Sequence, residues 1–206
     1  MHGCFITLEG IDGAGKSTHL AFIAAWLKAR GIDPLVTREP GGTPLGEKLR
    51  ELLLDRANGI SLDTETLMMF ASRQQLLTDV IRPALDAGRW VVSDRFTDAT
   101  FAYQGGGRGV PEERIRQLEQ WVQQGLQPDL TFLFDLPQRV AAQRLFTTRE
   151  LDRFEQQEAA FHQRVRQTYL KRALVEKRCC VIDADREPML IQVDIAAALQ
   201  RLVESC

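Results

Sequence analysis

The chain lacks the features that mark membrane-spanning and secreted proteins. None of its 206 residues belongs to an apolar run long enough to cross a bilayer. Met1 to Cys4 lead straight into a strand-like segment, without the basic region and apolar stretch of a secretory signal. The four cysteines show no metal-ligand spacing, which argues against a zinc site and predicts reduced thiols. We therefore expect a cytoplasmic protein with no membrane partner.

An excess of positive charge is also missing. Lysine and arginine total 26 against 28 aspartates and glutamates, a formal net charge of -2. A protein that binds duplex nucleic acid usually has a basic excess, so we expect no nucleic-acid partner. Hydrophobic residues make up 44% of the chain, enough for one domain with a substantial core. We expect residues 1–206 to form that single domain.

Short apolar runs alternate along the chain with longer stretches of helical period. The longer stretches predict helices over residues 16–30, 44–54 and 64–87. The short runs predict five strands, over residues 4–9, 34–37, 90–93, 131–134 and 179–182. Strands that are apolar on both faces and separated by helices indicate an α/β fold, a doubly wound five-stranded parallel sheet flanked by helices. Ligands of such sheets bind outside the carboxyl ends of the strands.

The first strand is followed by a phosphate-binding motif. Gly10 to Ser17 match the pattern G-x-x-x-x-G-K-[ST], between a strand and a helix as the motif requires. Backbone N–H groups of such a loop surround phosphate oxygens, and the helix points its positive dipole end at them. We expect Lys16 to bridge the outer phosphates and Ser17 to bind Mg²⁺. The expected ATP-binding residues are Gly10, Ile11, Asp12, Gly13, Ala14, Gly15, Lys16, Ser17 and Thr18.

Asp12 has two interpretations from the sequence alone. A carboxylate beside phosphates repels them unless it serves Mg²⁺ or a hydroxyl group of the acceptor. It could equally be a solvated turn residue.

Further polar residues follow the next two predicted strands. Arg38 ends the second strand and is placed to bind an anion. Asp94 and Arg95 follow the third strand, where an aspartate commonly orders Mg²⁺ or a basic neighbour and an arginine can fork onto a phosphate. These residues therefore predict a second anion site at the same edge of the sheet.

Two other groups of residues indicate a binding site for a flat base. Phe70 and Arg73 are three residues apart on a predicted helix and so share a face, although a helical phenylalanine more often belongs to the core. Thr100, Tyr103 and Gln104 precede a glycine-rich turn. Gln104 can donate and accept hydrogen bonds at once, as recognition of a pyrimidine amide edge requires.

Together these segments resemble the bacterial thymidylate kinases. The resemblance rests on six motifs, in family order, that span most of the chain: EGIDGAGKST, TREPGGTPLGEKLRELLL, LMMFASRQQL, SDRFTDATFAYQGGGRG, PDLTFLFDLP and ELDRFE. It implies a P-loop nucleoside monophosphate kinase fold. It also implies transfer of the γ-phosphoryl group of ATP to dTMP with Mg²⁺, giving dTDP for dTTP biosynthesis.

The resemblance also implies roles for individual residues. Phe70 would stack on thymine, Arg73 would bind a ring carbonyl, and Thr100 and Gln104 would read the rest of the base edge. Asp12 would bind the sugar. Arg38 and Arg95 would hold the acceptor phosphate, supported by Asp94. The family forms homodimers by packing helices, and the apolar residues from Leu67 to Leu77 are candidates for that face, although core is their commoner fate.

A segment at about residues 139–155 resembles the lid of these kinases. It carries Arg144, Arg149 and Arg153, and the last two would share one face of a helix. Gly13 stands where one group of the family has a catalytic arginine, so the resemblance implies that the lid supplies it. The arginines could also belong to a solvated helix that pairs them with Glu150 and Asp152. We expect Arg149→Ala or Arg153→Ala to lower kcat far more than dTMP affinity, by roughly 10³–10⁵ for a lost arginine finger.

Two other functions are compatible with parts of the pattern. One is another nucleoside monophosphate kinase or a nucleoside kinase, which substrate choice would distinguish. The other is a P-loop regulatory ATPase, which would hydrolyse ATP equally with and without dTMP. A base-reading set of residues and lid arginines favour the kinase.

Overall fold

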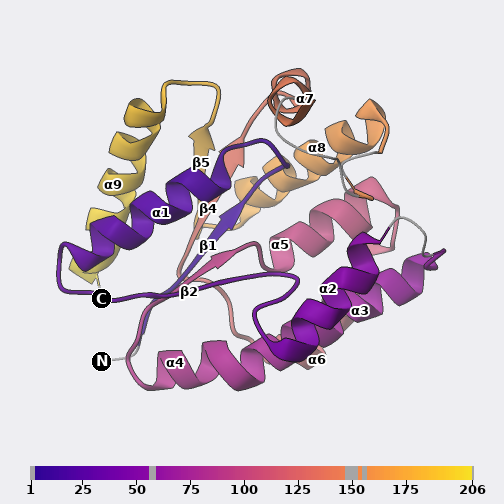
Figure 1. The fold of residues 1–206 in the computed structure, drawn as a ribbon, viewed down its shortest axis with the longest axis horizontal. Coiled ribbons are helices and arrows are strands. Elements are labelled where there is room, and N and C mark those ends of the chain that lie inside the picture. Colours follow the sequence, from indigo (N-terminus) through magenta and orange to yellow (C-terminus); the bar gives the residue numbers. More distant parts are fainter. Residues whose placement is uncertain (1–2, 56–58, 147–152, 155–156, 206) are drawn as a thin grey trace.

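A five-stranded parallel sheet forms the centre of the computed structural model (Figure 1), which describes residues 3–55, 59–146, 153–154 and 157–205. The strands are β1 (Phe5–Glu9), β2 (Leu35–Arg38), β3 (Val91–Asp94), β4 (Leu130–Asp135) and β5 (Cys179–Asp183). Their order across the sheet is β2-β3-β1-β4-β5, and every pair is parallel. This arrangement confirms the predicted doubly wound fold.

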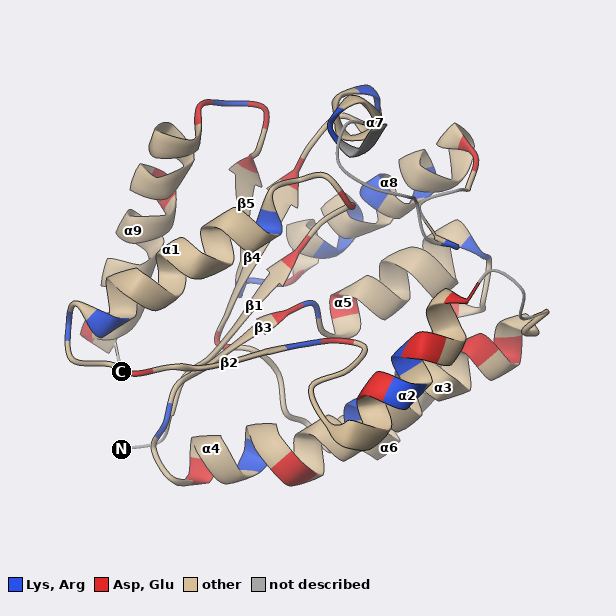
Figure 2. Cartoon of the chain, in the orientation of Figure 1, with Lys and Arg blue, Asp and Glu red and all other residues tan. Residues whose placement is uncertain are grey.

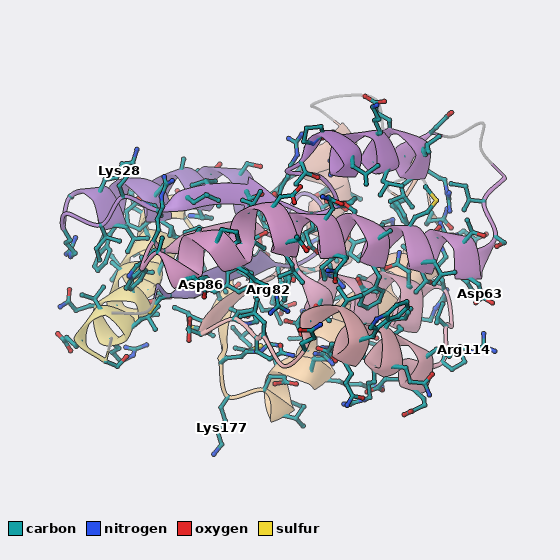
Figure 3. All side chains as sticks on the ribbon, turned by 90° about the horizontal axis from the view of Figure 1, so that it is seen from below. Lys28, Asp63, Arg82, Asp86, Arg114 and Lys177 are labelled. Atoms are coloured by element: carbon teal, nitrogen blue, oxygen red, sulfur yellow. The ribbon has the colours of Figure 1, made fainter. Side chains whose placement is uncertain are left out.

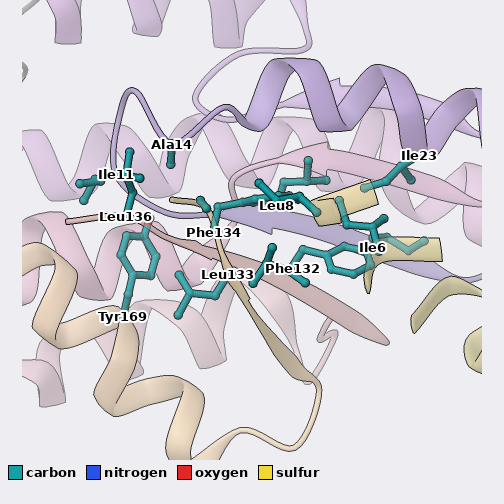
Figure 4. Close-up of a cluster of buried hydrophobic side chains, with 14 of the residues drawn as sticks. Ile6, Leu8, Ile11, Ala14, Ile23, Phe132, Leu133, Phe134, Leu136 and Tyr169 are labelled. Carbon is teal, nitrogen blue, oxygen red and sulfur yellow. The ribbon is translucent and has the colours of Figure 1, made fainter. Parts of the chain in front are cut away.

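Alternate residues of the strands point to opposite faces of the sheet. On one face, Ile6, Leu8 and Val92 belong to a core cluster with residues of α1 (Lys16–Lys28) and α9 (Pro188–Ser205). Ile23 of α1 is among the side chains of this cluster in Figure 4. These two helices therefore cover the first face.

The opposite face carries Phe5 and Val91, which pack in a second cluster. Its other members come from the run α3 (Leu62–Leu76), η1 (Leu77–Ile81) and α4 (Arg82–Asp86), and from α6 (Glu112–Gln123). Tyr169 of α8 (Ala159–Val175) donates to Glu9 at the end of β1, at 2.9 Å, which brings α8 to this face as well. Both faces of the sheet are thus covered, as its apolar strands require.

The predicted helix over residues 44–54 is confirmed as α2 (Pro44–Leu54), and the predicted helical region 64–87 as the run from α3 to α4. Within that run, η1 is one turn of π-helix, closed by a bond from the backbone N–H of Arg82 to the carbonyl of Leu77. Pro83 follows directly and has no N–H to donate to an earlier turn. The wider turn therefore lets the helix continue past a proline.

A second π-helix, η2 (Phe101–Gly107), follows α5 (Thr97–Thr100) and packs against α8. Glycines make this contact possible. A Cβ on Gly106 would lie 1.9 Å from Oγ1 of Thr168, and one on Gly107 would lie 2.5 Å from the ring of Phe161. The glycine-rich turn therefore serves close packing beside the site.

The cysteines differ from the sequence expectation at one position. Cys179 and Cys180 are free thiols, as expected, but Cys4 is disulfide-bonded. The expectation of reduced thiols is therefore wrong at Cys4. Within the part of the chain that the structure describes, no helix is long and apolar enough to cross a membrane.

Candidate active site

The phosphate loop joins the end of β1 to the start of α1. Gly10, Gly13 and Gly15 have positive φ angles of 134°, 83° and 84°. Residues other than glycine rarely adopt this backbone conformation. A Cβ on Gly10 would lie 2.5 Å from the carbonyl oxygen of Phe134 in β4. The loop therefore needs glycine both for its turns and for its approach to the sheet.

Lys16 is the first residue of α1 and is 7% exposed. Its Nζ donates to the carbonyl oxygens of Gly10 and Ile11, each at 3.0 Å, and lies 3.9 Å from Asp12. Burial, followed by the repulsion of Arg95, lowers the pKa of Lys16. The ammonium group is thus held inside the loop, where phosphate oxygens can replace the carbonyls.

Arg95 links this loop to the opposite side of the site. Its Nη2 donates to Asp12 at 2.6 Å and to the Tyr103 hydroxyl at 3.0 Å, and its Nη1 donates to the Tyr169 hydroxyl at 3.2 Å. Burial opposes ionisation of Asp12, but Arg95 and Lys16 outweigh it and hold its pKa well below the usual range. Asp12 is therefore an ionised partner of Arg95. This excludes the alternative that Asp12 is a solvated turn residue.

Glu9 lies beneath this group and is fully buried. It accepts hydrogen bonds from the backbone N–H of Phe96 at 2.7 Å and from the Tyr169 hydroxyl at 2.9 Å. Burial and the nearby charge of Asp98 raise the pKa of Glu9 to about 8. The Glu9 carboxyl group therefore helps to position Arg95 indirectly. It binds the Tyr169 hydroxyl, which Arg95 contacts, and the backbone N–H of Phe96, which follows Arg95 in the chain.

A cavity opens beside these residues. The ribbon in Figure 2 shows positions of both charge signs, red and blue, close to the ends of β1, β2 and β3. The structure brings six of the predicted substrate-binding residues together in its lining: Asp12, Arg73, Arg95, Thr100, Tyr103 and Gln104. It is also lined by residues that the sequence analysis did not identify: Glu39, Pro40, Arg50, Leu54, Met69, Phe96, Ala99 and Phe154. Glu39 and Pro40 could have been found, because they follow Arg38 in the TREPGGT motif.

Arg73 is buried and held in one orientation. Its Nε donates to Oε2 of Glu39 at 2.8 Å, and its Nη2 donates to Oγ1 of Thr100 at 2.9 Å. Among the described residues, its Nη1 has no hydrogen-bond partner. Arg73 therefore has one donor to offer to a ligand in the cavity.

Gln104 is also buried, and its Nε2 donates to Oε1 of Glu65 at 3.0 Å. Glu65 lies in the first turn of α3 and accepts further hydrogen bonds from Arg108, at 3.1 Å, and from Arg153. No pattern in the sequence marks Glu65, since an acidic residue near the start of a helix is also a normal surface feature.

Phe70 does not lie where the sequence predicted. Phe70 is 2% exposed and packs in the second core cluster, with its ring centroid 4.7 Å from Cζ of Arg73. Met69, the preceding residue of α3, lines the cavity instead. The expectation that Phe70 presents its ring to a base is thereby corrected. Arg73 reaches the cavity with its guanidinium end, so the Phe70 ring can share its helix face and still remain in the core.

Two other predicted residues lie outside the cavity lining. Arg38 pairs with Glu47 of α2 at 2.9 Å and has a half-exposed side chain. Asp94 does not line the cavity either, and its Oδ1 is buried with no hydrogen-bond partner among the described residues. Ser17 and Thr18 are exposed at the start of α1.

The predicted lid falls partly outside the described residues, and Arg149 is one of the residues concerned. Arg144, in α7 (Gln138–Phe146), donates to the carbonyl oxygen of Ala184 at 3.3 Å. Arg153 contacts Glu65 of α3, which does not itself line the cavity. The structure therefore does not bring Arg144 and Arg153 together.

Comparison with known proteins agrees with this site. The family model described as thymidylate kinase matches residues 8–195. A thymidylate kinase of Chromobacterium violaceum is 64% identical over 98% of this chain and 96% of its own length. A thymidylate kinase of Neisseria meningitidis is 62% identical over 88% of both chains. A crystal structure of thymidylate kinase from Ehrlichia chaffeensis superimposes with a TM-score of 0.80 at 33% identity, over 97% of this chain and all of that one.

A phosphate loop and a cavity lined by both polar and apolar side chains thus share one sheet edge, in a chain whose relatives match it over nearly its whole length. The chain belongs to the thymidylate kinase family.

Proposed function

We propose that this chain transfers the γ-phosphoryl group of ATP to dTMP, giving dTDP and ADP. The main support is the bridge that Arg95 makes between the loop residue Asp12 and the cavity residue Tyr103. One guanidinium group thus touches both the donor loop and the acceptor cavity. A phosphoryl transfer enzyme needs such a group, because positioning and charge neutralisation supply most of its catalysis.

On the acceptor side, the base would lie between Met69 and the polar edge formed by Arg73, Thr100 and Gln104. Asp12 would accept a hydrogen bond from a sugar hydroxyl. Arg95 would hold the acceptor phosphate in line with the loop, and Arg38 would join it after leaving Glu47.

On the donor side, the loop from Gly10 to Thr18 would hold the triphosphate, and Lys16 would leave its two carbonyl partners for the outer phosphates. A second cavity is lined by Arg144, Asp185, Arg186, Glu187 and Leu190. It lies where the chain leaves β5, and it would receive adenine.

Mg²⁺ would enter with ATP, held by Ser17 and Asp94. The buried Oδ1 of Asp94, which has no hydrogen-bond partner in the described part of the chain, and the exposed Ser17 fit a hard cation that prefers oxygen ligands. When bound, the ion neutralises charge on the phosphate oxygens. No group of three His, Cys, Asp or Glu side chains with metal-binding geometry occurs among the described residues, so most ligands would be phosphate and water.

Arg144, Arg149 and Arg153 remain candidates for catalysis from a lid at about residues 139–155. Gly13 supports this proposal, because the loop itself carries no arginine. Arg153 would have to leave Glu65 to reach a phosphate.

We further propose one kinase domain over residues 1–206, a homodimer and a cytoplasmic location. Leu45, Leu52 and Leu67 leave 49%, 50% and 54% of their surface exposed on α2 and α3, which supports a helix-packed interface there. Leu76 and Leu77 are buried within the monomer and are not available for it. Sedimentation equilibrium would measure the state of assembly.

The experiment that tests the function is a coupled assay of ADP release with dTMP, dUMP, UMP, CMP, GMP and thymidine as acceptors. We expect dTMP to have the highest kcat/KM. A preference for thymidine would contradict the phosphate-binding roles of Arg38 and Arg95, and ADP release independent of any acceptor would indicate a regulatory ATPase.

A further inference from the structure

We propose that Glu65 determines which base the cavity accepts, by fixing the orientation of the Gln104 amide. Glu65 is a positioning residue in this proposal, since Gln104 and not Glu65 lines the cavity. The proposal rests on the proposed function, because it concerns the base of the acceptor nucleotide.

The first step concerns the charge of Glu65. Its side chain is 1% exposed and lies between two guanidinium groups, those of Arg108 and Arg153. A carboxylate that accepts hydrogen bonds from two guanidinium groups has only acceptor oxygens to offer a third partner. The atom of Gln104 that faces it must therefore be Nε2, the donor, which is the arrangement observed at 3.0 Å.

The second step concerns what remains of the amide. With Nε2 turned to Glu65, Oε1 of Gln104 is the acceptor that is left for the cavity. Arg73 offers the opposite polarity there, because Glu39 and Thr100 hold two of its nitrogens and leave Nη1 as a donor. The buried carboxylate of Glu39 thus orients Arg73, which offers a donor. The buried carboxylate of Glu65 orients Gln104, which offers an acceptor.

The third step compares this pattern with the pyrimidine bases. Thymine and uracil present an acceptor, O4, beside a donor, N3–H, and so complement Arg73 and Gln104. Cytosine presents a donor amino group beside the acceptor N3, which opposes both. A buried polar group that meets the wrong partner loses its hydrogen bond and its solvation. Glu65 would therefore act against cytosine without contacting the base.

Replacement of Glu65 by glutamine tests this directly. A glutamine at position 65 can accept from Gln104 or donate to it, so the Gln104 amide loses its fixed orientation. We expect Glu65→Gln to reduce the ratio of kcat/KM for dTMP to that for dCMP by about 10- to 100-fold, from the loss of one or two matched hydrogen bonds. Its KM for dTMP should rise more than its kcat falls.

Asp63→Asn is the matched control, because it makes the same carboxylate-to-amide change in the same helical turn. Asp63 lies at the end of the molecule beside Arg114, at 3.4 Å and with 69% of its side chain exposed (Figure 3). For Asp63→Asn, we expect the ratio of kcat/KM for dTMP to that for dCMP to equal the ratio of the parent. A second test of mechanism is Gln104→Met, which removes both amide atoms, so adding Glu65→Gln to it should change the ratio no further.

Melting temperatures show whether each variant folds. If Glu65→Gln does not fold, Glu65→Asp keeps the negative charge for both arginines and withdraws it from Gln104 by one methylene, with a smaller loss of selectivity expected. A folded variant of either kind that keeps the parent ratio overturns the role of Glu65. A parent enzyme that does not phosphorylate dTMP would instead overturn the proposed function, so the two failures are distinguishable.

Discussion

Arg95 has a positive φ of 73°, which is uncommon for a residue with a side chain and costs of order 1–3 kcal/mol. Neighbouring groups hold the backbone there. The Arg95 N–H donates to the carbonyl of Leu8 at 2.9 Å, and the Phe96 N–H donates to Glu9 at 2.7 Å. The turn directs the guanidinium group back toward Asp12 instead of away from the sheet. At this scale, the proposed function depends on a strained residue, Arg95, whose backbone turn is held through the hydrogen bond of the next residue to Glu9.

Glu9→Gln should change how stability depends on pH. Burial raises the pKa of Glu9 from 4.5 to about 8, so between these values the folded protein binds more protons than the unfolded chain. Stability from this group is therefore present below pH 4.5 and is lost as the pH rises toward 8. The glutamine variant does not titrate, so relative to the parent it should become progressively more stable from pH 5 to pH 9.

Urea unfolding at pH 5, 7 and 9 measures this difference. Glu112→Gln, at an exposed position on α6, is the control and should show a constant difference. A constant difference for Glu9→Gln as well would show that Glu9 is ionised throughout this range.

Arg73→Lys should lower kcat/KM for dTMP by about 100-fold, mainly through KM. Lysine keeps the charge but cannot hold Glu39 and Thr100 while offering a third nitrogen to the base. Steady-state kinetics measure the change, with the exposed Arg116→Lys as control. An unchanged KM for dTMP would remove Arg73 from the base-binding edge.

At the scale of elements, the site depends on how closely η2 approaches α8. Tyr103 and Gln104 lie in η2, while Tyr169 and Arg164 lie in α8, and Arg164 donates to the carbonyl of Gly107 at 2.8 Å. Tyr103 and Gln104, both in the π-helix η2, line the cavity. Short π-helical turns are frequent at functional sites.

Gly106→Ala should destabilise the protein by about 1–3 kcal/mol, because the new Cβ would lie 1.9 Å from Oγ1 and 2.8 Å from Cβ of Thr168. Gly105→Ala is the matched control in the same turn. Its new Cβ would lie 3.2 Å from the flexible end of Ile115, so its effect should be neutral or favourable. Thermal unfolding compares the two, and equal melting temperatures would argue against close packing of η2 on α8.

At the scale of the whole molecule, the phosphate loop and the cavity, the proposed donor and acceptor sites, belong to one cooperative fold, because both extend from the same sheet edge. Either nucleotide should therefore stabilise the entire domain. At 100 times its dissociation constant, dTMP or ADP should each add about 2.7 kcal/mol to the free energy of unfolding. Calorimetry with each ligand, and with both, measures this. Stabilisation by ADP alone would indicate a protein with a donor site and no acceptor site.

The sequence by itself predicted six of the residues that line the cavity. It determined the sheet and the phosphate-loop motif. Strands that are apolar on both faces can only be buried on both sides, and a G-x-x-x-x-G-K-S loop after a strand has one geometry. These features are local, so their residues are adjacent in the chain.

Only the tertiary structure decided which side chains reach the cavity and what orients them. Phe70 and Met69 are neighbours on one helix, and the packing of that helix against the sheet puts the ring in the core and the methionine in the cavity. Glu65 meets Gln104 and Arg153 across 39 and 88 residues of sequence. Such contacts depend on how distant elements pack, and no local pattern encodes them.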